Sequence, residues 1–144
     1  MFYSAEREQL HANVQTYLAA IEVSAANQAP KAIIAPHAGY IYSGPVAASA
    51  YAQLLSVRDR IHRVILLGPS HRVAIKGLAT SSADSFTTPL GSIRLDQAAI
   101  NSLANLSQVH CLDKAHALEH SLEVPLTFLQ ETLDDFQLVP LVVG

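Results

Sequence analysis

The chain has 144 residues, of which 50% are hydrophobic and 15% are charged, and its formal net charge is −3. This composition excludes intrinsic disorder, and the slight acidity excludes the basic surface that nucleic acids or anionic membranes attract. No apolar window is long enough to predict a membrane span or a signal peptide, and the single cysteine excludes an internal disulfide framework. We therefore expect one folded domain over residues 1–144, located in the cytoplasm.

The N-terminal part of the chain predicts one helix followed by one strand. Apolar residues recur at helical spacing after Ser4, a residue type that caps helices, so residues 5–24 are expected to form an amphipathic helix. Residues 27–30 break this pattern. The apolar run at residues 31–35 ends at Pro36 and predicts a short buried strand.

The next segment predicts a helix and a second strand. Residues 37–42 are expected to form a loop, and Ser43 and Pro45 mark the start of a helix that continues to about residue 57. The aliphatic run at residues 63–67 is the clearest strand signal in the chain. Strand, helix and strand in this order predict a parallel unit with a right-handed crossover.

The second half of the chain continues this alternation with shorter elements. The expected elements are weak strands at 77–81 and 92–95, a helix at 96–103 capped by Asp96, a strand at 108–112, a helix at 119–133 that contains Pro125, and a strand at 137–143 that contains Pro140. This order predicts an α/β fold with a mostly parallel sheet and helices on both faces.

Two histidines stand directly after predicted strands. His37 lies in a Pro-His-Ala-Gly-Tyr loop after residues 31–35, and His71 lies in a Gly-Pro-Ser-His loop after residues 63–67. Ligands of open α/β sheets bind at the carboxyl ends of strands, which lie about 4.8 Å apart, so we expect both imidazoles at one edge. A lone loop histidine is usually only a polar surface residue, but two at equivalent strand ends favour a shared metal ion.

The chain resembles the Memo family, because four of its motifs stand in the same order as in that family. They lie at residues 35–44 (Ala-Pro-His-Ala-Gly-Tyr, then Tyr-Ser-Gly), 67–71 (Leu-Gly-Pro-Ser-His), 84–90, and 119–123 (Glu-His-Ser-Leu-Glu). The resemblance covers nearly the whole chain, which is identified as similar to the N-terminal half of the family fold.

The resemblance implies the fold of the class III extradiol dioxygenases, which hold a non-haem iron with two histidines and a carboxylate. His37 and His71 correspond to the two histidines that carry the metal in Memo-like proteins. Those proteins are reported to take a cysteine from a later segment as the third ligand, and Cys111 does not stand at that position. The resemblance thus implies a truncated fold with an incomplete metal site.

Three further residues are candidate catalytic or positioning groups. Glu119 and His120 would orient the metal-binding histidines or move protons, although an acidic residue at a helix start also complements the helix dipole. Tyr40 would hydrogen-bond a substrate, or pack against the edge of the sheet. Ser70 follows a strand as a hydrolase nucleophile does, but Arg72 replaces the second glycine of a nucleophile elbow. The other histidines, His11, His62, His110 and His116, are expected at the surface.

These residues leave three functional hypotheses open. The first is a dioxygenase-type oxidoreductase that uses a divalent metal ion, iron in preference to copper or zinc, on a small-molecule or peptide substrate. The second is a non-catalytic module that binds a peptide or another ligand in the same cleft. The third is metal-dependent hydrolysis with zinc.

The expected partners follow from the resemblance and from the predicted sheet. The resemblance implies radical-SAM and AMMECR-like proteins as pathway partners. A sheet edge left open where the later half of the family fold would pair predicts a homo-oligomer. Neither a nucleic acid nor a membrane partner is expected.

Overall fold

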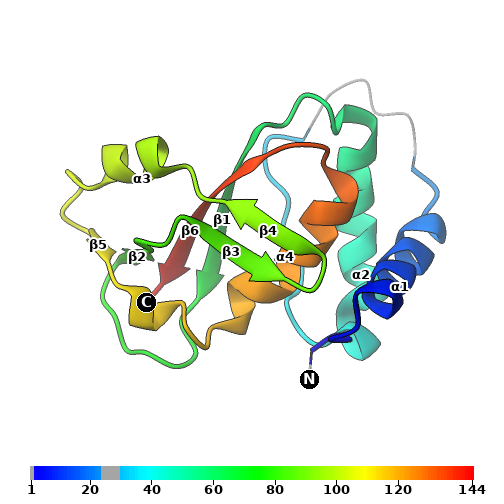
Figure 1. The fold of residues 1–144 in the computed structure, drawn as a ribbon, viewed down its shortest axis with the longest axis horizontal. Coiled ribbons are helices and arrows are strands. Elements are labelled where there is room, and N and C mark those ends of the chain that lie inside the picture. Colours follow the sequence, from blue (N-terminus) through cyan, green and yellow to red (C-terminus); the bar gives the residue numbers. More distant parts are fainter. Residues whose placement is uncertain (1, 24–29) are drawn as a thin grey trace. The chain divides into compact units, whose positions relative to one another are not determined.

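The computed structural model describes residues 2–23 and 30–144, which divide into two compact units. The helical unit comprises Met1–Ile61, Thr88–Gly91 and Val124–Asp135, and the sheet unit comprises His62–Thr87, Ser92–Glu123 and Phe136–Gly144. Together their elements form the mixed α/β fold with a mostly parallel sheet that the sequence predicts (Figure 1).

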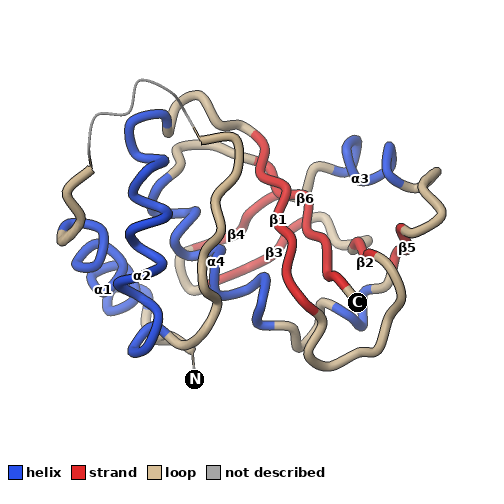
Figure 2. Tube along the Cα trace, turned by 180° about the vertical axis from the view of Figure 1, so that it is seen from behind, coloured by secondary structure: helices blue, strands red, loops and turns tan. Residues whose placement is uncertain are grey.

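The helical unit contains α1 (Arg7–Ala19), α2 (Tyr40–Tyr51), the 3-10 helix η1 (Ala52–Val57) and most of α4 (His120–Thr132). The buried face of α1 consists of Leu10, Val14 and Leu18, which are the residues whose spacing predicts this helix. Helices α1 and α2 lie side by side (Figures 1 and 2).

Helix α1 is shorter than the predicted range of residues 5–24. It begins after Glu6, and Ser4 does not cap it: the Ser4 hydroxyl instead accepts a hydrogen bond from the Glu6 N–H at 3.2 Å. The helix ends at Ala19 because its buried face ends one residue earlier, so no further packing holds another turn. The predicted break at residues 27–30 lies, except for Pro30, outside the described residues.

Helix α2 begins three residues before the predicted start at Ser43. The N–H of Tyr40 donates to the Phe2 carbonyl at 2.8 Å, which satisfies one of the amides that a helix start leaves unpaired. Ser43 therefore lies inside the first turn, where its hydroxyl donates to the Ala38 carbonyl at 2.8 Å. The predicted loop of residues 37–42 ends at Gly39.

Aromatic rings fill the core of the helical unit. The ring of Phe128 on α4 is fully buried, and its centroid lies 5.1 Å from those of both Tyr40 and Tyr51 on α2. Gly44 allows α1 to approach, because a Cβ at this position would lie only 2.6 Å from a ring carbon of Tyr17. Close packing of this kind accounts for the small residues in α2.

The sheet unit is built on four strands in the order β1-β6-β2-β5. They are β1 (Arg63–Pro69), β6 (Gln137–Val143), β2 (Leu78–Thr80) and β5 (Val109–Cys111). Strand β1 is parallel to β6 and β2 is parallel to β5, whereas β2 and β6 are antiparallel. Figure 2 shows β1 and β6 as the longest neighbouring strands.

Shorter elements complete the sheet unit. A hairpin pairs β3 (Ser85–Thr88) with β4 (Gly91–Arg94), and α3 (Gln97–Leu103) and the 3-10 helix η2 (Asp113–Ala115) follow. The predicted cap is confirmed, because the Asp96 carboxylate accepts from the Ala99 N–H at 2.9 Å. The sequence did not predict β3 as a strand.

The strand predicted at residues 31–35 is wrong. These residues form no strand, and Ile34 is 98% exposed. Strand β1 pairs instead with β6, the last strand, so the predicted strand-helix-strand unit is absent. A short apolar run has strand propensity, but a strand exists only where a partner offers its backbone, and the run itself does not encode that partner.

Strand β1 is an edge strand in the described part of the chain. Its one partner there is β6, and the side chains of Ile65 and Leu67 are 59% and 56% exposed on one face. An open edge with an aliphatic face is a template for pairing with another strand.

Pro140 occupies the one stretch of β6 that tolerates it. The Gln137 N–H donates to the His62 carbonyl on the β1 side, whereas the Leu138 carbonyl accepts from the Asp96 N–H on the opposite side. Because successive residues alternate, the missing N–H of Pro140 faces away from β1. Strand β2 pairs with β6 only at Val142 and Val143, so no ladder bond is lost at Pro140.

No helix in the described ranges has the length and apolar character needed to cross a membrane.

Candidate functional site

The loop after β1 carries His71 and is tied to the start of α4. The Ser121 hydroxyl donates to the Pro69 carbonyl at 2.8 Å. Gly68 permits this approach, because a Cβ there would lie 2.6 Å from the Ser121 oxygen and 2.9 Å from a methyl carbon of Leu122. The glycine of the Gly-Pro-Ser-His motif is therefore needed so that β1 and the first turn of α4 can pack closely.

Ser70 shapes this loop. Its N–H donates to the Val143 carbonyl at 2.8 Å, and its hydroxyl donates to the Val73 carbonyl. The hydroxyl hydrogen is thus used within the loop, which agrees with the sequence-based argument against a serine nucleophile.

Glu119 is the central anion of the site. Its side chain is 1% exposed, and its carboxylate accepts from the His71 ring at Nδ1 (2.7 Å), from the His71 N–H (2.6 Å) and from the Ser121 N–H (2.9 Å). Burial alone would raise the pKa of Glu119, but the hydrogen bonds from His71 and Ser121 outweigh it and lower the pKa to about 2. The group is therefore a carboxylate at neutral pH.

A carboxylate can only accept hydrogen bonds, so His71 donates from Nδ1. This contact fixes the His71 tautomer with the proton on Nδ1. A carboxylate that holds the far nitrogen of a histidine in this way is the usual partner of a metal-binding imidazole.

The ring of His120 stacks on that of His71. Their centroids are 4.3 Å apart with an interplanar angle of 22°, and Nδ1 of His120 lies 3.7 Å from the Glu119 carboxylate. One ring nitrogen of each histidine lies within 4.8 Å of the other. Two nitrogen ligands of one ion, each at about 2.1 Å from it, lie about 3–4 Å apart, so this pair fits a shared metal ion after small ring movements.

The structure thus brings together three of the predicted site residues, His71, Glu119 and His120, in the sheet unit. Glu119 makes a contact of the kind that each of its two interpretations requires, with the His71 ring and with the Ser121 N–H at the start of α4, and its role beside a metal ion stays a prediction. Sequence reasoning missed Ser121 as the link to β1. The Glu-His-Ser spacing was the available signal, because it places the hydroxyl two residues after the carboxylate.

His37 and Tyr40 belong to the helical unit. His37 is half-buried in the segment before α2. The Tyr40 hydroxyl donates to the Val124 carbonyl at 2.9 Å and contacts the Thr127 hydroxyl, and its ring is 3% exposed. Tyr40 therefore anchors the start of α2, directly after the loop that carries His37. That His37 and Tyr40 act with His71 stays a prediction.

His116 corrects one prediction, because it is not a surface residue. Its Nε2 lies 3.1 Å from the Ala79 carbonyl, and its ring lies 5.6 Å from that of Phe86. Burial lowers the pKa of His116, which favours the neutral ring. The sequence could not reveal this, because the contacts join residues that are 30 and 37 positions apart.

Comparisons with known proteins agree with the motifs. A family model described as Memo-like protein matches residues 1–144. A MEMO1 family protein of Saccharolobus islandicus is 46% identical over 112 residues, which cover 76% of this chain and 39% of that protein. The protein MEMO1 of Rattus norvegicus is 35% identical over 148 aligned residues, which cover 99% of this chain and 48% of the rat protein. The chain thus spans less than half the length of these relatives.

Proposed function

Because the chain belongs to the Memo-like family, we propose that it is a metal-binding protein with a non-haem oxidoreductase site of the dioxygenase type. One observation carries this proposal: the buried Glu119 carboxylate accepts a hydrogen bond from Nδ1 of His71, which is the kind of contact that orients a metal-binding imidazole. The chain spans less than half the length of these relatives. The activity that a whole protein of this family would have is therefore also proposed here, and not shown.

The proposed ligands are His37 and His71, and the ring of His120 stacks on that of His71. His37 is assigned from its Pro-His-Ala-Gly-Tyr motif and from the anchoring of that loop by Tyr40. We assign a divalent ion because neutral imidazoles bind iron, copper and zinc. We prefer iron because the family resemblance implies the fold of enzymes that hold a non-haem iron. Bound iron would supply the activation of dioxygen and substrate.

The protein residues have separate tasks in this proposal. Glu119 keeps the proton of His71 on Nδ1, so that the ring presents its unprotonated nitrogen. His120 is the proton carrier, because its ring lies against that of His71 and its Nδ1 lies near the same carboxylate. Tyr40 acts by positioning, since its hydroxyl is held by α4.

The remaining assignments concern substrate, partners and location. We propose a small-molecule or peptide substrate and pathway partners of the radical-SAM and AMMECR-like kinds, as the family resemblance implies. The open edge and aliphatic face of β1 support a homo-oligomer. The single cysteine supports a cytoplasmic location.

Anaerobic titration with Fe(II) and with Zn(II), followed by metal analysis of the desalted protein, tests the metal site. We expect bound metal in the wild-type chain and its loss in His37→Ala and His71→Ala, whereas the exposed His110→Ala should keep it. Metal content that is unchanged in His71→Ala, or absent from the wild type, would contradict the proposal.

A second measurement separates the competing functions. Dioxygen consumption that depends on Fe(II) supports the oxidoreductase. Peptide binding that survives chelation supports a non-catalytic module, and ester or amide hydrolysis restored by Zn(II) alone supports a hydrolase.

A further inference from the structure

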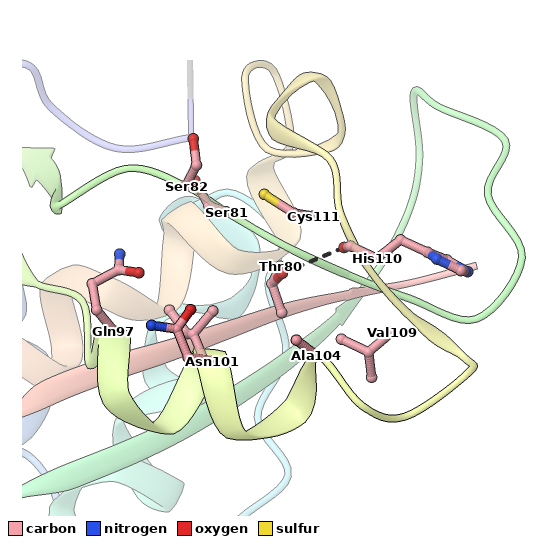
Figure 3. Close-up of a pocket in the computed structure, with 10 residues that line it drawn as sticks. Thr80, Ser81, Ser82, Gln97, Asn101, Ala104, Val109, His110 and Cys111 are labelled. Carbon is pink, nitrogen blue, oxygen red and sulfur yellow. Dashed lines mark hydrogen bonds between the residues drawn. The ribbon is translucent and has the colours of Figure 1, made fainter.

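A cleft of about 530 Å³ lies in the sheet unit between α3 and the segments around β2 and β5 (Figure 3). This volume is within the range of small-molecule pockets, which is about 300–1,000 Å³. The cleft shares no residue with the group formed by His71, Glu119 and His120.

One wall of the cleft offers carboxamides. Gln97 and Asn101 are one helical turn apart on α3, and Figure 3 shows both on the side of the helix that faces residues 80–82. The Gln97 amide nitrogen donates to the Ala83 carbonyl at 2.6 Å, which fixes the side chain and leaves its oxygen as an acceptor. Asn101 is exposed and offers both a donor and an acceptor.

The opposite wall offers hydroxyl oxygens in a fixed orientation. The Asp113 carboxylate accepts from the Ser81 hydroxyl at 2.9 Å and from the N–H and hydroxyl of Ser82 at 2.8 and 2.7 Å. Ser81 is 3% exposed and its oxygen already accepts from the Ala83 N–H at 3.2 Å, whereas Ser82 is exposed. Because the Ser82 hydroxyl hydrogen is donated to Asp113, its oxygen is the acceptor that this wall offers to a ligand donor.

The lining of the cleft includes buried apolar residues and carries no fixed charge. Ile100 and Val109, which are 6% and 8% exposed, are two of these apolar residues. Among the described residues that line it, none is an aspartate, glutamate, lysine or arginine. An ion that entered would lose its hydration without gaining an oppositely charged partner, which is costly.

We propose that this cleft binds an uncharged small molecule of about the size of a nucleoside. The molecule donates a hydrogen bond to the Ser82 oxygen, pairs an amide-like edge with Asn101 and lays an apolar ring face on Ile100 and Val109. The site is additional to the proposed metal centre, and its occupancy does not depend on a metal ion.

Cys111 gives a direct assay, because it is the single cysteine, is exposed and lines the cleft. The rate of its alkylation by N-ethylmaleimide is measured with uridine, N-acetylglucosamine or N-acetylalanine methylamide as neutral probes, and with uridine 5′-monophosphate as a charged probe. A probe that occupies the cleft slows alkylation, about twofold at a concentration equal to its dissociation constant. We expect slowing by uridine and no stronger slowing by the monophosphate.

Asn101→Ala should abolish the slowing, whereas the matched Asn105→Ala, an exposed change that does not touch the cleft, should keep it. Amide chemical shifts of the wild-type chain, recorded with uridine, should move at α3 and β5. The proposal is overturned if none of the three neutral probes slows alkylation, if the slowing survives in Asn101→Ala, or if the monophosphate protects more strongly than uridine.

Discussion

Replacing Glu119 with glutamine tests the organisation of the site directly. The substitution keeps the shape of the side chain but turns one carboxylate oxygen into an NH₂ group. If the remaining oxygen keeps the bonds from the His71 ring and the Ser121 N–H, the new NH₂ faces the His71 N–H, which now donates at 2.6 Å to the second oxygen. A donor would then meet a donor in a buried position.

The magnitude follows from these contacts. A hydrogen bond to a charged group contributes about 1.5–3 kcal/mol, and a buried N–H left without an acceptor costs about 1–3 kcal/mol. Because part of this cost is relieved by local movement, we expect Glu119→Gln to lower the free energy of unfolding by about 2–4 kcal/mol. Metal affinity should fall about 10–100-fold, since His71 loses the group that fixes its tautomer.

Urea unfolding followed by circular dichroism measures the stability, and two-bond ¹H–¹⁵N correlation spectra report which nitrogen of His71 carries the proton. Glu123→Gln is the matched control, because Glu123 is exposed on the next turn of α4 and should change stability by less than about 0.5 kcal/mol. Equal stabilities of the two variants, or a wild-type His71 protonated at Nε2 alone, would refute the reasoning.

Three further predictions concern packing and pH. Gly68→Ala places a Cβ 2.6 Å from the Ser121 oxygen, so it should lower the free energy of unfolding by about 1–3 kcal/mol in the same urea assay, and an unchanged midpoint would contradict the close approach. The hydrogen bonds from Ala99 and Arg63 lower the pKa of Asp96 below 3.8. This carboxylate therefore stabilises the fold above pH 3.8, and the stabilisation is lost as the pH falls below that value. Asp96→Asn should therefore reduce the fall in the free energy of unfolding that occurs below pH 3.8. Burial lowers the pKa of His116 below 6.5, so the unfolded chain binds this proton at a higher pH than the folded chain does. The free energy of unfolding therefore falls as the pH drops below 6.5, and His116→Gln should reduce that fall. If the free energy of unfolding changes equally between pH 7 and 5 in the wild type and the variant, the ring is not buried.

Local signals predicted the elements whose structure depends on local interactions. The Asp96 cap of α3 was correct because capping involves residues three apart in sequence, and the buried face of α1 followed from its apolar spacing. The start of α2 was misplaced because the Phe2 carbonyl, a distant group, accepts the N–H of Tyr40.

Partners that are far apart in sequence were beyond prediction from pattern alone. The apolar run at residues 31–35 predicts a strand, but a strand forms only where a neighbouring strand pairs with it. Strand β1 pairs with β6, the last strand, instead of with this run. The contact between Glu119 and His71 spans 48 residues, so the sequence could place each residue near the end of an element without showing that they meet. The sequence analysis offered Glu119 as a group that would orient the metal-binding histidines; within the sheet unit its carboxylate contacts the His71 ring, and its role beside a metal ion stays a prediction.

Pairing along β6 differs on its two sides. Strand β2, which carries β5, pairs with β6 only at Val142 and Val143, beyond Pro140. Strand β1 pairs with β6 along its full length. Because shorter pairing favours local opening, we expect the amide hydrogens of β2 and β5 to exchange faster than those of β1 and β6. The Gly68 contact beside His71 therefore belongs to the pair of strands with the longer pairing, and the cleft beside β5 belongs to the pair with the shorter one.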